Sequence, residues 1–229
     1  MIGIIGAMGE EIQILLNKSN VIRRIQLADM TFVQCELNGK DCVLVVSGIG
    51  KVNAAICAQI LISEFGADTI INTGVAGAID IRLNIGDIVI SSDLIEYDVD
   101  TSAFGDKKGV IPRMKTSVFK AEPNLIDMSY RASRKFEDLK SYRGRIISGD
   151  KFIADKEEVL RLKREFNGMA VEMEGAAIAH ACYLNQVPFV VIRSISDRAD
   201  GEAKFDYNKF VHLSAERASE IILDILNDL

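Results

Sequence analysis

The stretch CVLVVSGIGKVNAAICAQILISEF, residues 42–65, joins two different patterns through a turn that holds two glycines. Its first part is a nearly all-apolar run, which is expected of a strand covered on both faces. Its second part, KVNAAICAQILISEF, is long enough and apolar enough for a helix packed on a sheet. The stretch therefore predicts a strand, a tight turn and a helix in that order.

The same alternation continues along the chain. Further strands are predicted at 2–7, 69–74, 87–92, 145–149, 169–174 and 188–196, and further helices at 175–184 and from Phe210 to the C-terminus, where apolar residues recur with a 3.6-residue period. Strands that alternate with helices predict an α/β fold: a three-layer sandwich with a central mixed, largely parallel, twisted sheet flanked by helices. Three prolines, no Ser/Gly-rich linker and no internal repeat predict a single domain over 1–229.

Composition excludes several classes of function. The net charge is −6 and no Lys/Arg cluster stands out, which argues against a nucleic-acid partner. No apolar run approaches the roughly 18 residues that a membrane span needs, and the start of the chain lacks the features of a secretion signal. Four cysteines without CxxC spacing predict reduced core thiols and a cytoplasmic protein, and two isolated histidines do not suggest a metal site.

Glycines follow several of the predicted strands, at the edge of the sheet where α/β proteins bind their ligands. Gly9, Gly48, Gly50, Gly74 and Gly77 hold such positions. Glycine allows the backbone to approach a ligand closely, although each pair taken alone is more typical of a tight turn between a strand and a helix. Neither a P-loop nor a GxGxxG motif is present.

Acidic residues at the same strand ends are more informative. Glu172 and Glu174 are two apart on a predicted strand, so we expect their side chains on one face, with Arg193 nearby as a counter-charge. A carboxylate accepts hydrogen bonds well from the vicinal hydroxyls of a ribose. Asp197, if buried and protonated, could donate to a base nitrogen, and Glu11 could polarise a water.

A purely structural explanation remains open for each acid. Glu10 and Glu11 would also favour a helix N-terminus, and Glu172 could simply pair with an arginine. Four acids that converge on strand ends nevertheless favour a binding site.

Eight segments taken together resemble the bacterial 5′-methylthioadenosine/S-adenosylhomocysteine nucleosidases, within the nucleoside phosphorylase and nucleosidase superfamily. The segments are IGIIGAMGEE, SGIGKVNAA, INTGVAGA, IRLNIGDIVIS, TSAFG, SGDKFI, AVEMEGAAIAH and PFVVIRSISDRAD. They occur in the family's order and spacing almost from end to end. The resemblance implies a nucleoside phosphorylase-like fold and cleavage of an N-glycosidic bond by water, without a metal or an organic cofactor.

The resemblance also implies a role for individual residues. Glu11 matches the general base that activates water, and Asp197 matches the general acid at N7 of the adenine. Glu174, with Met173, matches the ribose site at the 2′ and 3′ hydroxyls. Glu172 would support Glu174, and Arg193 matches a residue beside the water.

Further positions match the walls of the substrate site. Phe152 corresponds to the residue that stacks on the base, and the backbone of Ile153 to the group that binds the adenine edge. The backbone of Ala76 and Gly77 corresponds to the floor of the substrate site, and Ser196 lies next to the general acid Asp197. The apolar pocket for the 5′-alkylthio group corresponds to Met8, Ile49, Tyr207 and Phe210. In the family a partner subunit closes this pocket through positions that correspond to Phe104 and Pro112, which implies a homodimer with shared active sites.

Three positions depart from the family pattern. Gly9 replaces a frequent glutamate, Val75 a frequent serine and Tyr207 a frequent phenylalanine. The loss of the serine hydroxyl bears on the polar network around the acid, and the added phenol bears on the preferred 5′ substituent. The expected substrates are 5′-methylthioadenosine and S-adenosylhomocysteine, with 5′-deoxyadenosine as a further one, in methionine salvage.

Three alternatives stay open at this point. A phosphorylase would need cationic donors, and the chain has Asn72 and Val75 where those relatives carry arginine and serine, with acidic Glu10 and Glu11 in the first loop. An aminodeoxyfutalosine nucleosidase would use the same adenine and ribose residues. A non-catalytic nucleoside-binding protein would be expected to lack Glu11 or Asp197, and both are present.

Overall fold

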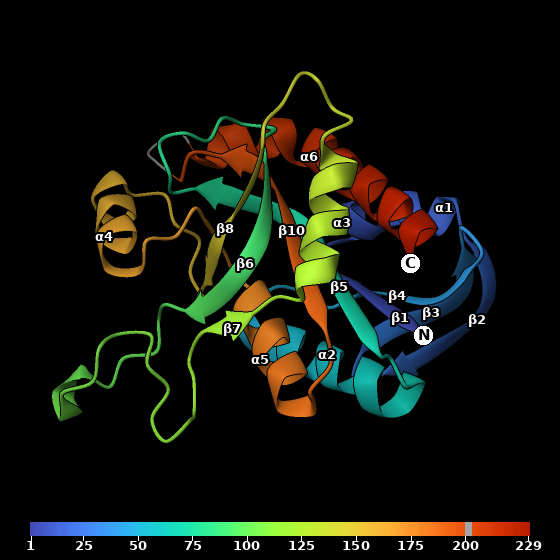
Figure 1. The fold of residues 1–229 in the computed structure, drawn as a ribbon, viewed down its shortest axis with the longest axis horizontal. Coiled ribbons are helices and arrows are strands. Elements are labelled where there is room, and N and C mark those ends of the chain that lie inside the picture. The colour runs from blue at the N-terminus through green and yellow to red at the C-terminus, as the bar shows by residue number, and fades with distance from the viewer. Residues whose placement is uncertain (200–202) are drawn as a thin grey trace.

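The computed structural model describes residues 1–199 and 203–229, without the side chains of 203–209 and of Val211. Its strands form one mixed sheet with helices on both sides (Figure 1). The strands are β1 (Ile2–Gly6), β2 (Asn20–Leu27), β3 (Met30–Leu37), β4 (Lys40–Val46), β5 (Thr69–Ala78), β6 (Ile88–Glu96), β7 (Phe119–Lys120), β8 (Ser141–Ser148), β9 (Ala170–Glu172) and β10 (Phe189–Asp197). The helices are α1 (Gly9–Asn17), α2 (Lys51–Phe65), a 3-10 turn η1 (Ser102–Phe104), α3 (Pro123–Ser133), α4 (Lys156–Phe166), α5 (Gly175–Asn185) and α6 (Ala203–Asp228).

Strand pairing divides the sheet into two parts. The strand order is β10-β6-β8-β9-β5-β1-β4-β3-β2, and an additional pairing joins β10 to β5. The strands β5, β10, β6, β8 and β9 therefore form a closed circuit, while β1, β4, β3 and β2 extend from it as an open sheet. The pairings of β1 with β4 and β5, of β5 with β10, and of β8 with β6 and β9 are parallel. The others are antiparallel, which makes the sheet mixed, as expected.

Apolar side chains fill the space on both sides of the sheet. One core lies against α2 and α5, where small residues such as Ala54, Ala58 and Ala179 are fully buried. A second core lies against α1, α3 and α6, with Leu15 and Ile221 among its buried members. Figure 1 shows α2 and α5 together on one side of the sheet and α1 with α6 on the other. This confirms the predicted layering of helices around a central sheet.

The four cysteines are free and buried, as the sequence predicted. Burial raises the pKa of the Cys42, Cys57 and Cys182 thiols to about 12. These thiols are therefore protonated at neutral pH and act as small apolar side chains. Among the residues described, no helix combines the length and hydropathy needed to cross a bilayer.

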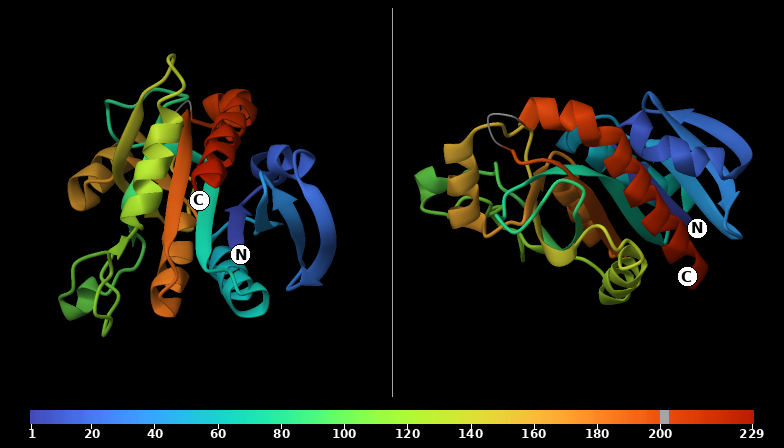
Figure 2. Two further views of the ribbon diagram at one scale, coloured as in Figure 1. Left: turned by 45° about the vertical axis from the view of Figure 1, so that its right-hand side comes forward. Right: turned by 90° about the horizontal axis from the view of Figure 1, so that it is seen from above.

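Every strand and helix predicted from the sequence is present, but several elements were missed. The strand β2 reads NVIRRIQL and is exposed along most of its length, so it lacks the apolar run used as a signal. Figure 2 shows it, in blue, at the outer margin of the sheet next to β3. The helices α3 and α4 were missed because they are rich in polar residues, α4 having only Leu162 and Phe166 buried.

One prediction about strand geometry is wrong. Glu172 and Glu174 do not lie two apart on one strand, because β9 ends at Glu172 and Glu174 is the N-cap residue of α5. The backbone of Glu174 has φ −133° and ψ −44°, outside the extended region. The two carboxylates are therefore held by a strand end and a helix start.

The cap of α4 supplies a test of local structure. Asp155 is the N-cap of α4 and accepts a hydrogen bond of 2.8 Å from the N–H of Glu158. We expect Asp155→Ala to lower the free energy of unfolding by about 1 kcal/mol, the usual cost of a lost cap. Urea denaturation measures it, and Asp155→Asn, which keeps the acceptor, is the control. Equal stability of the alanine variant and the wild type would contradict the assigned cap.

Candidate functional site

A cavity of about 390 Å³ lies at the carboxyl ends of the strands, where the sequence placed the ligand. The loops after β1, β4, β8 and β9 and the ends of β5 and β10 all contribute to its wall. The lining residues are Ala7, Met8, Glu11, Ile49, Val75, Ala76, Gly77, Phe152, Val171, Glu172, Met173, Glu174, Ser196 and Asp197. Four carboxylates thus meet in one cavity whose remaining wall is mostly apolar. Among the lining residues, Ala7 and Val171 were not anticipated, since neither carries a chemical signal in the sequence.

Some of the predicted site residues lie elsewhere. Ile153 is buried in the apolar cluster beside α4, and Arg193 lies behind Glu172. Phe210 is half-buried on α6 and does not line the cavity. Phe104 and Pro112 are exposed, on the segment between β6 and β7 that projects from the body of the molecule (Figure 1). The side chain of Tyr207 lies outside the described residues.

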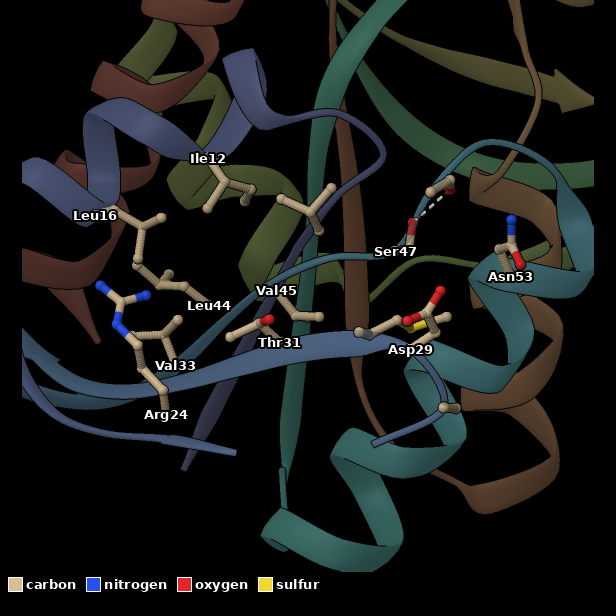
Figure 3. A pocket seen from close by; sticks show the side chains of 14 residues that line it. Ile12, Leu16, Arg24, Asp29, Thr31, Val33, Leu44, Val45, Ser47 and Asn53 are labelled. Carbon is tan, nitrogen blue, oxygen red and sulfur yellow. Dashed lines mark hydrogen bonds between the residues drawn. The ribbon is translucent and has the colours of Figure 1, made fainter. Parts of the chain in front are cut away.

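Another cavity, of about 560 Å³, lies between α1 and the strands β2 to β4 (Figure 3). Its lining mixes aliphatic side chains such as Ile12, Leu16 and Val33 with polar ones. Figure 3 shows its charged members, Arg24 and Asp29, apart from each other. Since none of the acids at the strand ends reaches it, this cavity is not the candidate site.

Glu11 is held rigidly at the start of α1. One carboxylate oxygen accepts hydrogen bonds from the N–H groups of Ala7 at 2.6 Å and Met8 at 3.0 Å, and the other accepts one from Val75 at 3.2 Å. Only 3% of Glu11 is exposed. Burial raises its pKa, against the opposing effects of Arg193 and the backbone donors. Glu11 therefore does serve the helix N-terminus, and it is also placed in the cavity as a carboxylate of raised basicity.

Glu172 and Arg193 form a fully buried ion pair at 2.6 Å. The same oxygen of Glu172 accepts hydrogen bonds from the N–H groups of Glu174 at 3.1 Å and Gly175 at 2.7 Å, while Ser148 donates to its other oxygen. Arg193 also donates to the side chain of Asn72 at 2.6 Å. The structural explanation for Glu172, an ion pair with an arginine, is therefore correct, and this carboxylate is occupied by protein donors. Ser148 and Asn72 were not recognised as parts of this network.

Glu174 faces the cavity with fewer protein partners. Its carboxylate accepts a hydrogen bond of 2.9 Å from the N–H of Gly50, in the turn before α2. Burial, and then the charge of Glu172, raise its pKa to about 7, although Arg193 acts in the opposite direction. A carboxylate whose ionisation is opposed by burial and by a like charge is expected to gain from hydroxyl donors supplied by a ligand.

Asp197 ends β10 and is 2% exposed. One of its oxygens accepts a hydrogen bond of 2.8 Å from the hydroxyl of Ser196, and the other one of 2.8 Å from the N–H of Ala199. A Cβ atom at Gly77 would lie only 3.0 Å from the second oxygen, so glycine is needed for this close approach.

The strand β5 sets the spacing between two of the acids. Glu11 is bound to the N–H of Val75, whereas Asp197 pairs with Gly77, two residues further along the strand. Two residues of strand correspond to roughly 6–7 Å. Inverting glycosidases hold their two carboxyl groups ~6.5–9.5 Å apart to leave room for a water. The spacing along β5 refers to the backbone positions that the two acids contact, and it places both carboxylates on the same cavity.

The raised pKa of Glu174 predicts a pH-dependent stability. In the unfolded chain this carboxyl ionises near pH 4.5, and in the folded protein near pH 7, so the folded state loses stability as the pH rises through this window. We expect Glu174→Gln to be more stable than the wild type by about 3 kcal/mol at pH 8, and the difference to shrink toward pH 5. Urea denaturation at both pH values measures this. The exposed Glu10→Gln is the control, and a difference that does not change with pH would contradict the assignment.

Comparison with known proteins shows the family to which the chain belongs. The sequence model of the Phosphorylase superfamily matches residues 1–227. A 5′-methylthioadenosine/S-adenosylhomocysteine nucleosidase of Staphylococcus carnosus is 42% identical over 230 residues, with both chains covered completely.

Solved structures show the same similarity. The nucleosidase of the same name from Neisseria meningitidis, in complex with methylthio-immucillin-A, matches with a TM-score of 0.95 and 38% identity over 100% of this chain and 99% of that one. The futalosine hydrolase of Helicobacter pylori matches with a TM-score of 0.94 and 33% identity over 100% and 97%. The chain therefore belongs to the 5′-methylthioadenosine/S-adenosylhomocysteine nucleosidase family of the phosphorylase superfamily.

Proposed function

We propose that this protein hydrolyses the N-glycosidic bond of 5′-methylthioadenosine and S-adenosylhomocysteine. The products are adenine and 5-methylthioribose or S-ribosylhomocysteine. The observation that carries the proposal is the placement of Glu11 and Asp197 at opposite ends of the segment Val75–Gly77, in one cavity with Glu174. Membership of the nucleosidase family supports the same reaction.

The proposed mechanism follows from the charges that develop as the bond breaks. Positive charge grows on the sugar and negative charge on the departing adenine. Asp197 donates its proton to N7 of the adenine and so neutralises the leaving group. Glu11 takes a proton from the attacking water, and its raised pKa makes it a stronger base than an ordinary glutamate. Glu174 accepts hydrogen bonds from the ribose hydroxyls.

The remaining wall suits the other parts of the substrate. Phe152 is 46% exposed at the cavity, and its ring offers a face on which adenine can stack. Met8 and Ile49 are apolar lining residues suited to the 5′-alkylthio group. The side chain of Val75 has no hydroxyl, and its N–H donates to Glu11. The hydroxyl that contacts Asp197 belongs to Ser196.

Charge in the cavity argues against phosphorolysis. No lysine or arginine is among the described lining residues, and the nearby guanidinium of Arg193 donates to Glu172 and Asn72. A phosphate dianion bound there would meet the carboxylates of Glu11 and Glu174, without a cation among those lining residues to neutralise it. An aminodeoxyfutalosine nucleosidase activity is the second candidate, favoured by the likeness to the Helicobacter pylori futalosine hydrolase.

A cytoplasmic homodimer that shares its active sites completes the proposal. Val52 and Ile56 of α2 and Leu184 of α5 are 68%, 42% and 63% exposed, and the two helices pack side by side. Ile49, at the mouth of the cavity, is 56% exposed and Phe104 is 89% exposed. A second copy of the chain seated on α2 and α5 would cover this apolar surface and could close the alkylthio end of the site.

The first experiment is adenine release from 5′-methylthioadenosine and from S-adenosylhomocysteine, run with and without phosphate. Equal release in both buffers, with the free sugar as co-product, is the expected outcome. Release that depends on phosphate and yields a sugar 1-phosphate would mean that the chain is a phosphorylase. Faster turnover of aminodeoxyfutalosine than of either substrate would favour the second candidate.

Substitution of the two acids tests their roles. We expect Glu11→Gln and Asp197→Asn each to lower kcat by roughly 10²–10⁴-fold, since an amide neither accepts the water proton nor delivers one to adenine. KM should change much less than kcat. Glu10→Gln, an exposed neighbour of the base, is the control and should retain wild-type turnover. A kcat within threefold of wild type (a threshold of about 0.7 kcal/mol) in either variant would remove that residue from the mechanism.

A further inference from the structure

The only hydrogen bond described between Glu174 and the turn before α2 comes from a residue in an unusual conformation. Gly50 is the N-cap of α2, with φ +98° and ψ 160°, a region that favours glycine. Its N–H is the donor to Glu174. Having no side chain, Gly50 cannot cap the first turn of α2, where free N–H groups need acceptors. Something else must fix this turn.

Asp150 supplies the missing acceptor from a distant part of the chain. It lies in the loop after β8, and its carboxylate accepts a hydrogen bond of 2.8 Å from the N–H of Lys51, the first residue of α2. The same oxygen would lie 3.2 Å from a Cβ atom at Gly50, so it is packed directly against the glycine. Asp150 thus caps α2 in place of a local side chain.

Asp150 is itself anchored. Its N–H donates to Asp98, after β6, at 3.0 Å. The ammonium group of Lys51 donates to Asp98 at 2.6 Å and to Glu96 at 3.0 Å. These contacts tie the ends of β6 and β8 to the start of α2. The network therefore holds the N–H of Gly50 at a fixed place relative to the cavity, although Asp150 does not line that cavity.

We infer that Asp150 is a positioning residue for the ribose carboxylate. By fixing Lys51 it sets the N–H of Gly50 against Glu174, and this contact orients the carboxylate toward the ribose hydroxyls. The inference rests on the proposed function only for the identity of the ligand. The contacts themselves involve protein atoms alone.

The test compares Asp150→Ala with two matched variants. We expect Asp150→Ala to raise KM for 5′-methylthioadenosine by roughly 5- to 10-fold, the factor that corresponds to one lost cap, with kcat changed less than twofold. Asp150→Asn keeps an oxygen acceptor for the N–H of Lys51 and should restore wild-type KM. Asp155→Ala removes a helix cap in the same loop without contact to Gly50, and should leave KM unchanged.

Two further measurements distinguish a positioning role of Asp150 from general damage to the site: inhibition by adenine and titration of the Glu174 carboxyl group. Adenine has no ribose, so its inhibition constant should be the same in Asp150→Ala and wild type. In the ligand-free protein, the pKa of Glu174 followed by carboxyl-carbon NMR should rise in Asp150→Ala, because the Gly50 donor is one of the groups that lower it.

An unchanged KM, or a parallel loss of adenine binding, would overturn the inference. If the wild type released no adenine, the proposed function would fail. The carboxyl titration would then still decide whether Asp150 positions Glu174.

Discussion

The buried ion pair between Arg193 and Glu172 is the interaction on which the rest of the site depends. It joins β10 to the end of β9, and through Asn72 and Ser148 it reaches β5 and β8. Glu172 also receives the first N–H groups of α5, so the pair fixes the start of that helix. Removing one partner of such a pair leaves an uncompensated buried charge, which typically costs about 3–5 kcal/mol. The pair is therefore required for the structure of the cavity, although Arg193 itself lies behind the cavity wall.

With the central pair satisfied by protein, the neighbouring acids remain available to a ligand. Glu174 has its one described backbone donor and a raised pKa, whereas Glu11 is oriented by three backbone donors. The fold orients these carboxylates before any substrate is present. Preorganisation of this kind lowers the reorganisation that a charged transition state requires.

The fold could be predicted from the sequence where the strands are nearly continuous apolar runs. The strand β3 was missed although most of it is buried, because Thr31, Gln34 and Glu36 interrupt its apolar residues. The seven predicted strands are apolar because helices or neighbouring strands cover them, while the missed β2 and α4 are solvent-exposed and have no comparable pattern. The acids could be found because carboxylates in an apolar context are costly. The path of the backbone at Glu174 could not be predicted from the sequence. A strand that stops after three residues differs from a longer one only in its backbone dihedral angles. The roles of Ser148, Asn72 and Asp150 could not be predicted either, because each depends on contacts with residues distant in sequence.

The exposed strand β2 has a consequence for how copies of the protein can meet. On one side the sheet closes on itself through β5, β10, β6, β8 and β9, with the two-residue strand β7 attached to β6. On the other side it terminates at β2, which among the described strands pairs with β3 alone and carries Arg23 and Arg24 in adjacent exposed positions. Charged side chains on a terminal strand oppose the edge-to-edge pairing that leads to sheet polymers and aggregation. Self-association through this edge of the sheet is thus disfavoured by the charges of β2.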